Sequence, residues 1–297
     1  RPSPLDKFLM SFDKSGSEWV LFAYIANEPR MIEIVEGEES PHTITGSYIS
    51  SLTRDIVEKE NNLVGTETDA TKIERLRSGM VGADGGTGLL EGATFLPRSM
   101  SIRQAGKKSN FGFNYAEGYR KWAADNNVSE AEAKSIRALY LEEAYPGIPE
   151  YWEQVEHALE HNNRTLTNCF GRKRRFLDVW GPDLTKAAIA FRPHSTSVDI
   201  VNQFGWLKWW DNRHDFQAEC LLQVHDELIF QHPMQDMGAA TRFAESMKKY
   251  LEPTVEYNGH SFKVGTTMKV GLNRGNMTTI ALGDITEQEL KEWQATL

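Results

Sequence analysis

The chain has 297 residues, of which 40% are hydrophobic and 25% are charged, and its formal net charge is −9. This composition is ordinary for a soluble globular protein. No apolar run approaches the roughly 20 residues that span a bilayer, and the first residues lack the pattern of a secretory signal. The two cysteines, Cys169 and Cys220, favour a reducing compartment without a disulfide framework. We therefore expect a cytoplasmic protein with no membrane partner.

The cations of this acidic chain are clustered. Residues 172–175 are four consecutive cations, and four more lie between Arg98 and Lys108. The affinity of a protein for phosphates depends on where its cations lie and not on the total charge. At this point both a solvated basic face and a nucleic-acid contact remain open.

The first part of the chain predicts one strand followed by helices. An apolar stretch at 5–12 predicts a strand that ends at Asp13. Apolar residues then recur every three or four positions over 18–35 and again over 42–52, which predicts two helices.

Residues 53–97 are charged and then glycine-rich, and they are the least regular part of the predicted pattern. The glycine-rich segment at 82–88 is not followed by the Lys-Ser/Thr pair of a phosphate-binding loop, and no strand leads into it. We expect it to be a surface loop.

The second part of the chain predicts further helices and then strands. Ser129 and Glu132 form a capping box at the start of one helix, and Gly171 marks the turn of a hairpin. In chain order the predicted elements are a helix over 99–115, a helix from 129 to about 145, a helix that ends near His161, the hairpin over 164–179, a long helix from 185 to about 211, strands at 218–224 and 227–231 joined by a tight turn at His225-Asp226, a helix over 237–251, a strand over 261–272 and a short helix capped by Thr286 and Glu289.

The order of these elements predicts an α+β fold. Strands cluster near both ends of the chain, and helices fill the middle. We therefore expect the two ends to share one sheet, with the helical section inserted between them.

One predicted helix carries cations and aromatic rings on one face. Arg103, Lys107, Phe111 and Tyr115 are spaced by four, so their side chains follow the same side of the helix. Fixed cations can bind a polyphosphate, and aromatic rings can hold a base by stacking. An amphipathic helix whose aromatic residues belong to the core is the alternative that the spacing leaves open.

Two aspartates end predicted strands at distant places in the chain. Asp226 lies at the tight turn of a hairpin, where an aspartate is also common for conformational reasons alone. Asp13 ends the first predicted strand. If the fold brings the two together, they can hold two Mg²⁺ ions for an in-line phosphoryl transfer.

Six segments in this order resemble those of the family A (DNA polymerase I-like) DNA polymerases, and they cover nearly the whole chain. Residues 13–26 resemble the first palm motif, and residues 103–118 resemble the fingers motif R-x(3)-K-x(3)-F-x(3)-Y. VHDE at 224–227 resembles the second palm carboxylate motif. The other three matches are NCFGRKRR at 168–175, PHSTSVDI at 193–200 and VGLNRGNM at 270–277.

The resemblance implies a role for each matched residue. Asp13 and Asp226 would bind two Mg²⁺ ions, with the backbone carbonyl of Lys14 as a further ligand. Glu227 would be a supporting catalytic carboxylate, and Lys107 would also be catalytic as a proton donor to pyrophosphate. The residues implied to contact the dNTP are Arg103, Lys107, His42, Phe111, Tyr115, Glu18, which crowds the sugar 2′ carbon, and Lys14. The residues implied to contact DNA are His225, His194, Arg172, Arg174 and Lys186.

The sequence departs from the family pattern at positions that face the duplex. His194, Lys186 and Ala190 replace side chains that assist in reading the minor groove, and Arg274 replaces a tryptophan near the C-terminus. Minor-groove inspection is therefore not carried over to this chain. The implied metal site and triphosphate contacts match the pattern. Residues 53–97 are longer than the family's usual connection before the fingers helix, so we expect a solvated insertion, and a contact with a template or with a partner protein is the alternative.

The resemblance also implies an architecture and partners. We expect a right-hand polymerase fold with an antiparallel palm sheet and a large helical fingers insertion, but without thumb and exonuclease. Residues 1–39 would be the first part of the palm, 40–184 the fingers and 185–297 the second part of the palm. The match begins at the first palm motif, so we expect a split, processed or truncated polymerase that an N-terminal polymerase part completes. The implied partners are primer-template DNA and dNTPs, and the divergence and apparent splitting indicate a phage origin, with the host cytoplasm as location.

Two other functions remain open. Single-subunit RNA polymerases share the Arg-Lys-Tyr helix and both aspartates, but they usually lack a glutamate matching Glu18 and have serine in place of Glu227. A catalytically silent polymerase-like subunit that only binds DNA or partners is the second alternative. Retention of both aspartates, Asp13 and Asp226, and of both cations, Arg103 and Lys107, argues against it.

Overall fold

The computed structural model describes residues 6–80, 88–280 and 285–297. The chain divides into two compact units, each made of several segments. Unit 1 comprises residues 1–21, 167–173 and 192–297, and unit 2 comprises residues 22–166 and 174–191. None of the helices in the described ranges is long and apolar enough to cross a membrane.

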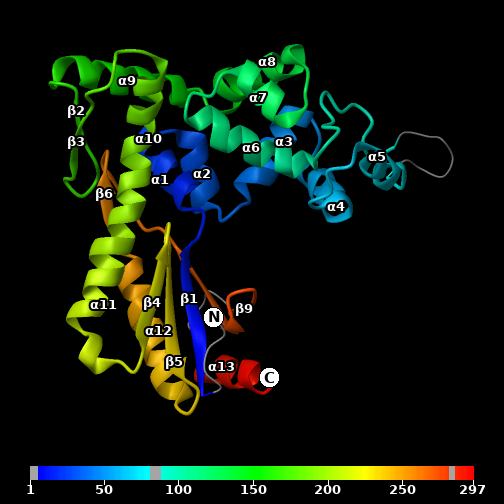
Figure 1. Cartoon of the computed structure of the whole chain (residues 1–297). Coiled ribbons are helices and arrows are strands. Elements are labelled where there is room, and N and C mark those ends of the chain that lie inside the picture. The colour runs from blue at the N-terminus through cyan, green and yellow to red at the C-terminus, as the bar shows by residue number, and fades with distance from the viewer. Residues whose placement is uncertain (1–5, 81–87, 281–284) are drawn as a thin grey trace. The chain divides into compact units, whose positions relative to one another are not determined.

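Unit 1 is built on a five-stranded antiparallel sheet in the order β4-β5-β1-β8-β9 (Figure 1). The first strand of the chain, β1, pairs with β5 on one side and with β8 on the other. The prediction that the two ends of the chain share one sheet is therefore confirmed. The strands are β1 Lys7–Lys14, β4 Glu219–Val224, β5 Glu227–Pro233, β8 Thr266–Asn273 and β9 Asn276–Ile280.

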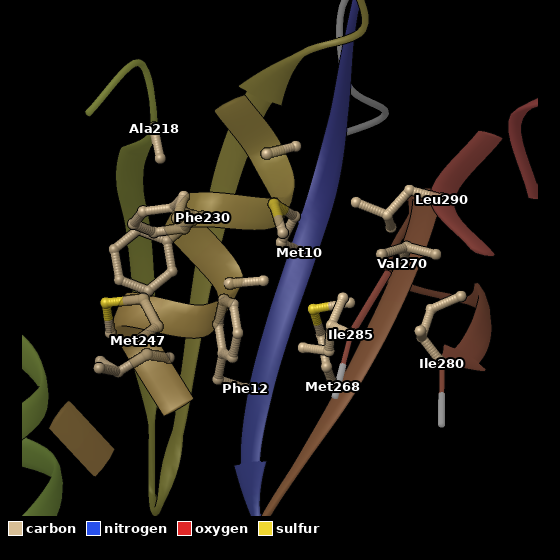
Figure 2. Close-up of a cluster of buried hydrophobic side chains, with 14 of the residues drawn as sticks. Met10, Phe12, Ala218, Phe230, Met247, Met268, Val270, Ile280, Ile285 and Leu290 are labelled. Atoms are coloured by element: carbon tan, nitrogen blue, oxygen red, sulfur yellow. The ribbon is translucent and has the colours of Figure 1, made fainter. Parts of the chain in front are cut away.

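An apolar core lies between this sheet and two helices (Figure 2). Met10 and Phe12 of β1 and Phe230 of β5 are buried in one cluster with side chains of α12 Met237–Leu251 and α13 Glu287–Gln294. Burying each of these large side chains contributes about 1.5–3 kcal/mol. Since successive residues of a strand point to opposite faces, this core fixes which residues of β1 lie on the other face.

Unit 1 contains several shorter elements, and a few elements include residues of both units. Those confined to unit 1 are a π-helical segment Ile200–Trp206, α11 Leu207–Asp211, a 3₁₀ helix Arg213–Asp215, and the strands β6 Val255–Tyr257 and β7 His260–Phe262, which pair with each other. Those with residues of both units are α1 Ser17–Ala26, α10 Pro182–Asp199, β2 Thr165–Thr167 and β3 Lys173–Arg175.

Unit 2 is largely helical, and two of its helices cross with their backbones in contact. A Cβ atom at Gly106 of α6 would overlap the carbonyl oxygen of His42 and lie 2.6 Å from the amide nitrogen of Gly46 in α3. Only glycine allows this approach. The helices confined to unit 2 are α2 Pro29–Glu36, α3 Pro41–Ser50, α4 Arg54–Val64, α5 Ala70–Ser78, α6 Ile102–Asn114, α7 Tyr119–Asn126, α8 Glu130–Ala138, a π-helical segment Leu139–Ala144 and α9 Gly147–His161.

Many local predictions are confirmed. The capping boxes of Ser129 with Glu132 and of Thr286 with Glu289 are both formed. Gly171 has a φ of 84° between β2 and β3, as a hairpin turn there requires. The predicted helix over 237–251 matches α12. Strong local signals therefore set these elements.

The prediction for residues 53–97 is wrong in one important respect. This segment is not simply a solvated insertion, since it forms α4 and α5 and buries Val57, Val64 and Ile73. The apolar stripe of α4 is interrupted by a buried charged residue, Glu60, which hides the helical periodicity. Residues 81–87, which hold most of the glycine-rich segment, lie outside the described residues.

Other boundaries also differ from the predictions. The helix expected over 18–35 breaks at Asn27, which has a φ of 53° and is followed by the capping residue Glu28 and by a proline. The strand expected over 261–272 is divided into β7 and β8, which belong to different sheets. The short elements α7, β6 and β9 were not predicted, because their apolar patterns are too brief to identify a period.

Candidate active site

Strand pairing in unit 1 brings the two predicted metal-binding aspartates together. In the ladder of β1 and β5, Asp13 lies directly opposite Glu227. Asp226 immediately precedes Glu227, at the turn between β4 and β5. The turn is tight because His225 adopts a left-handed φ of 54°. We call the three carboxylates of Asp13, Asp226 and Glu227 the acidic site.

Two serine hydroxyls, hydrogen-bonded in series, hold the carboxylate of Asp226. The Ser17 hydroxyl, at the start of α1, donates to Oδ2 of Asp226 over 3.0 Å. The Ser197 hydroxyl of α10 donates to the oxygen of Ser17 over 3.2 Å. Both serines are buried. Restricting the carboxylate in this way reduces the conformational entropy that it loses when it binds a ligand.

Glu227 is held on both of its carboxylate oxygens. Ser11, on the same face of β1 as Asp13, donates to Oε1 over 2.5 Å. Arg274 donates from Nη2 to Oε2 over 2.8 Å, and half of its side chain is exposed. Glu227 therefore has partners inside the protein for both oxygens.

The pKa of Asp13 is raised, first by burial and next by the negative charge of Asp226. The ammonium group of Lys269 acts in the opposite direction. Burial and the charge of Asp226 thus both disfavour the ionised form of Asp13, and a divalent cation bound here would favour it. Among the residues described, no group of three or more His, Cys, Asp or Glu side chains is arranged to hold a metal ion. Two aspartates suit Mg²⁺, which keeps waters and substrate oxygens as its other ligands.

The side chain of Lys14 is buried and anchors the end of β1. Its Nζ donates to the carbonyl oxygens of Leu251 and Val264, over 2.6 and 2.5 Å, and to the hydroxyl of Thr266 over 3.1 Å. Burial lowers its pKa to about 8. Three acceptors satisfy the three hydrogens of the ammonium group, so Asp13 directly precedes a residue that is fixed in place. The predicted metal contact concerns the backbone carbonyl of Lys14 and stays a prediction.

Two predicted contact residues of unit 1 pair with each other. Nε2 of His194 on α10 lies 3.1 Å from Oε1 of Glu18 on α1, and both side chains are partly exposed. His225 is exposed beside Asp226. Their predicted contacts with the sugar and with DNA stay predictions.

Arg172 forms an ion pair with a buried carboxylate. Its Nε donates to both oxygens of the fully buried Asp199, over 2.9 and 3.0 Å, and Asn168 donates to the same group over 2.7 Å. Burial favours the neutral acid, but these hydrogen bonds still lower the pKa of Asp199. Arg172 thus holds the loop after β2 to α10, and its predicted DNA contact stays a prediction.

In unit 2, α6 presents the predicted nucleotide-binding residues together with one residue of α3. Lys107 is exposed and lies over the ring of Phe111, 5.8 Å from its centroid. The ring of His42, on α3, is 6.0 Å from that of Phe111. The cations of Arg103 and Lys107 both lower the pKa of His42, so they lie near its ring. We call these four residues the cationic face.

His42 is neutral at physiological pH. Burial is the largest cause that lowers its pKa to about 4, followed by the charges of Arg103 and Lys107. Nδ2 of Asn110 lies 3.1 Å from Nδ1 of His42, and Oδ1 of Asn110 accepts from Thr45. The amide therefore donates to Nδ1, which leaves the ring proton on Nε2.

The remaining predicted residues of unit 2 are placed as follows. Tyr115 ends α6, and its ring meets that of Phe22 edge-on at 5.5 Å. Arg174 is exposed on β3, with its guanidinium 4.6 Å from the centroid of Phe176. Lys186 lies on α10 and is partly buried. Their roles stay predictions.

A solved structure with the same fold is the POL domain of Pol1 from M. smegmatis in complex with DNA primer-template and dNTP. Its TM-score with this chain is 0.64 at 17% sequence identity, and the match covers 91% of this chain and 40% of that one. The α+β fold with an antiparallel sheet and a large helical section is therefore that of a polymerase domain, as expected.

The family follows from the sequence match. Residues 97–276 match the model of DNA polymerase family A, and the chain belongs to this family. Relatives include DNA polymerase I of Treponema pallidum, 26% identical over 59% of this chain, and DNA polymerase I of Bacillus caldotenax, 23% identical over 81%. The thermostable DNA polymerase I of Thermus aquaticus is 26% identical over 51%. The matched regions are 17%, 23% and 19% of these relatives, so the chain spans about a fifth of their length.

Sequence reasoning missed several residues that build the acidic site. Ser11 belongs to no matched motif, and Ser17 and Ser197 lie within matched motifs but were not singled out, because their partners are far away in the sequence. The distance from Ser17 to Asp226 is 209 positions. Arg274 was identified only as a departure from the family pattern. Its pairing with Glu227 depends on the turn between β8 and β9, which no sequence signal located.

Proposed function

We propose that this chain carries the nucleotide-adding centre of a template-directed DNA polymerase. It would transfer deoxynucleotides from dNTPs to the 3′ end of a primer paired with template DNA. One observation carries the proposal: the register of β1 and β5 sets Asp13 opposite Glu227 and near Asp226, so that three carboxylates lie together at the end of these strands. Membership of DNA polymerase family A supports it.

In this proposal Asp13 and Asp226, with the backbone carbonyl of Lys14, hold two Mg²⁺ ions. When bound, such a pair of ions stabilises the attacking and leaving oxygens of a phosphoryl transfer. Ser17 keeps Asp226 in one orientation, while Ser11 and Arg274 keep Glu227 as a supporting carboxylate. The protein contributes mainly position and charge, because phosphoryl transfer requires little covalent chemistry from it.

The cationic face binds the triphosphate in this proposal. Arg103 and Lys107 supply fixed charges, and the Nε2 proton of His42 donates to a phosphate oxygen. Lys107 also supplies a proton to the departing pyrophosphate. Phe111 packs beside the incoming sugar and Tyr115 beside the template base. Glu18 crowds the sugar 2′ carbon and so excludes ribonucleotides.

His225, His194, Arg172, Arg174 and Lys186 are the proposed DNA contacts. Arg174 is the most favourable of the cations, because it is exposed and makes no ion pair among the described residues. Arg172 reaches DNA only if it also keeps its partner Asp199. A contact by either would weaken with added salt, as phosphate contacts do.

The proposal includes a polymerase part outside this chain that provides the thumb, either as a preceding segment of the same polypeptide or as a separate protein. The edge strand β4 supports it. Leu221 and Leu222 of this strand are 44% and 49% exposed. An uncovered apolar edge strand is a site where another polypeptide can add.

Primer extension tests the proposal. The chain, alone and with candidate N-terminal polymerase parts, is assayed with dNTPs or rNTPs and Mg²⁺. We expect dNTP incorporation, and Asp226→Asn should lower its rate by at least about 1,000-fold, because a metal site supplies several kcal/mol of transition-state stabilisation. DNA binding should persist in this variant. Asp211→Asn, at an exposed position on α11, is the matched control.

Each other outcome of this assay rejects a part of the proposal. Equal use of rNTPs would indicate an RNA polymerase-like enzyme. DNA binding without incorporation in the presence of every candidate N-terminal part would indicate a catalytically silent subunit. Full activity of Asp226→Asn would remove the acidic site from the mechanism.

A further inference from the structure

The start of α6 is bound by the segment that precedes it. Ser101 caps the helix by accepting from the amide of Gln104, over 3.2 Å, and donates to Oδ1 of Asn61 on α4 over 2.8 Å. The amide of Ile102, the first residue of α6, donates to Oε2 of Glu60 over 2.9 Å. A carboxylate at this end also interacts favourably with the helix dipole.

The other oxygen of Glu60 is bound by Arg77 of α5. Nε and Nη2 of Arg77 donate to Oε1 over 2.9 and 2.5 Å. The side chain of Glu60 is 0% exposed and that of Arg77 is 11% exposed. Arg77 also donates to the carbonyl oxygens of Pro97 and Met100, over 2.6 and 3.1 Å. Two side chains therefore join α4, α5 and the segment that leads into α6.

This pair differs from an ion pair at the surface. The exposed pair of Arg54 and Glu39 in the same unit has side chains that are 56% and 43% exposed, and such pairs contribute little. Removing one member of a buried, fully hydrogen-bonded pair leaves the other without a partner, which is costly. Both carboxylate oxygens of Glu60 accept hydrogen bonds, Oε1 from Arg77 and Oε2 from the amide of Ile102.

Apolar packing joins the same elements. Leu52, Val57 and Ile102 form a small buried cluster, against which Ile56 and Leu90 pack. The close crossing at Gly46 and Gly106 joins α3 to α6 on the other side. The helices α3, α4, α5 and α6 are thus held together by polar contacts, apolar contacts and direct backbone contact.

We propose that Glu60 and Arg77 form a latch that sets the position of α6, so that α4 and α5 act as a positioning element for the cationic face. Arg103 directly follows Ile102, the residue whose amide Glu60 binds, and Lys107 lies about one turn further along α6. A shift or fraying of the first turn would displace Arg103 most and His42 on α3 least. This inference rests on the proposed function only where it concerns nucleotide binding.

Hydrogen exchange tests the latch without any assay of activity. In Glu60→Ala, the amide of Ile102 loses its acceptor, so this amide and the rest of the first turn of α6, which then frays, should exchange at least about tenfold faster than in the wild-type chain. Glu39→Gln, which breaks the exposed pair with Arg54, should leave this exchange unchanged. Unchanged exchange in Glu60→Ala would overturn the proposal.

Nucleotide kinetics then separate positioning from support of the fold. In Glu60→Ala we expect KM for the dNTP to rise by about five- to tenfold, with kcat and the Kd for primer-template within about twofold. Arg77→Lys keeps the charge but loses the forked hydrogen bonds, so it should show the same change in smaller degree. If Glu60→Ala unfolds unit 2, Arg77→Lys is used in its place for both measurements. Faster exchange at the start of α6 together with an unchanged KM would assign Glu60 to stability alone and overturn the proposal.

The two proposals can fail separately. If the wild-type chain incorporates no nucleotide, the proposed function fails while the exchange experiment still decides the latch. In that case binding of a dNTP, measured by calorimetry in wild type and Glu60→Ala, replaces the kinetics, and equal affinities would overturn the positioning role.

Discussion

The acidic site of unit 1 and the cationic face of unit 2 gather charge of opposite sign in different ways. The acidic site is fixed by hydrogen bonds from Ser11, Ser17 and Arg274, and burial with like charge raises the pKa of Asp13. On the cationic face Lys107 is exposed, and the neighbouring His42 loses its charge instead. Water stabilises the cations, whereas the protein itself must stabilise the carboxylates.

This difference predicts which substitutions should change stability and which should change ligand affinity. Groups that fix a buried site belong to the fold, so their loss should lower the free energy of unfolding. Exposed groups should be removable with little effect on stability but with a measurable effect on ligand affinity. The following predictions test this contrast, from the largest expected effect to the smallest.

The contrast has one exception, because the backbone beneath the cationic face is as tightly packed as any core. Gly106→Ala should destabilise unit 2 by about 3 kcal/mol, since the overlap with the backbone of His42 and Gly46 outweighs the gain of about 1 kcal/mol in helix propensity. Denaturant unfolding measures the change. Gly181→Ala is the control, because a Cβ there has no atom within 4 Å. A Gly106→Ala chain as stable as the control would show that the crossing of α3 and α6 is loose.

Lys14→Met should lower the free energy of unfolding by about 2 kcal/mol, because the buried carbonyl oxygens of Leu251 and Val264 lose their donor. The comparison is Lys7→Met on the same strand, where a surface ion pair with Glu219 is lost and the effect should stay below about 1 kcal/mol. Urea unfolding of both variants gives the two values. Equal effects would mean that Lys14 does not anchor β1.

Lys107→Ala should act on affinity rather than stability. Loss of one fixed charge should raise KM for the dNTP by about tenfold, or about 1.4 kcal/mol, and loss of the proposed proton donor should also lower kcat, while the unfolding midpoint stays near that of wild type. Lys108→Ala, at the adjacent exposed position, is the matched control and should change KM by less than about twofold. If the two variants behaved alike, the cationic face would act only through its overall charge.

The pH dependence of stability should report the neutral state of His42. Its folded pKa of about 4 lies below the unfolded value of 6.5, so the unfolded chain binds the proton more tightly. The stability that the neutral His42 contributes is fully present above pH 6.5 and is lost as the pH falls toward 4. At pH 5.5 the loss is on the order of 1 kcal/mol. His42→Gln should flatten the stability profile between pH 7 and 5. A profile of the variant parallel to that of wild type would contradict the assigned state.

Sequence alone determined the local elements and the identity of the chemical groups. Capping residues, the spacing by four along α6 and the turn residues at Gly171 and His225 act over a few positions, where short-range sterics and hydrogen bonds decide the conformation. The motifs also indicated the family, which the comparisons confirm. The order of the predicted strands and helices also indicated that both ends of the chain share a sheet, as they do.

Tertiary structure decided which groups meet. Asp13 joins Asp226 only through the register of β1 and β5, and the supports from Ser197 and Arg274 follow from the same packing. The Glu60–Arg77 pair was hidden, because a buried charge within an apolar stripe is indistinguishable in sequence from a surface residue. A local pattern contains no information about a partner that lies far along the chain, and burial, which gives such a contact its energy, exists only in the folded protein.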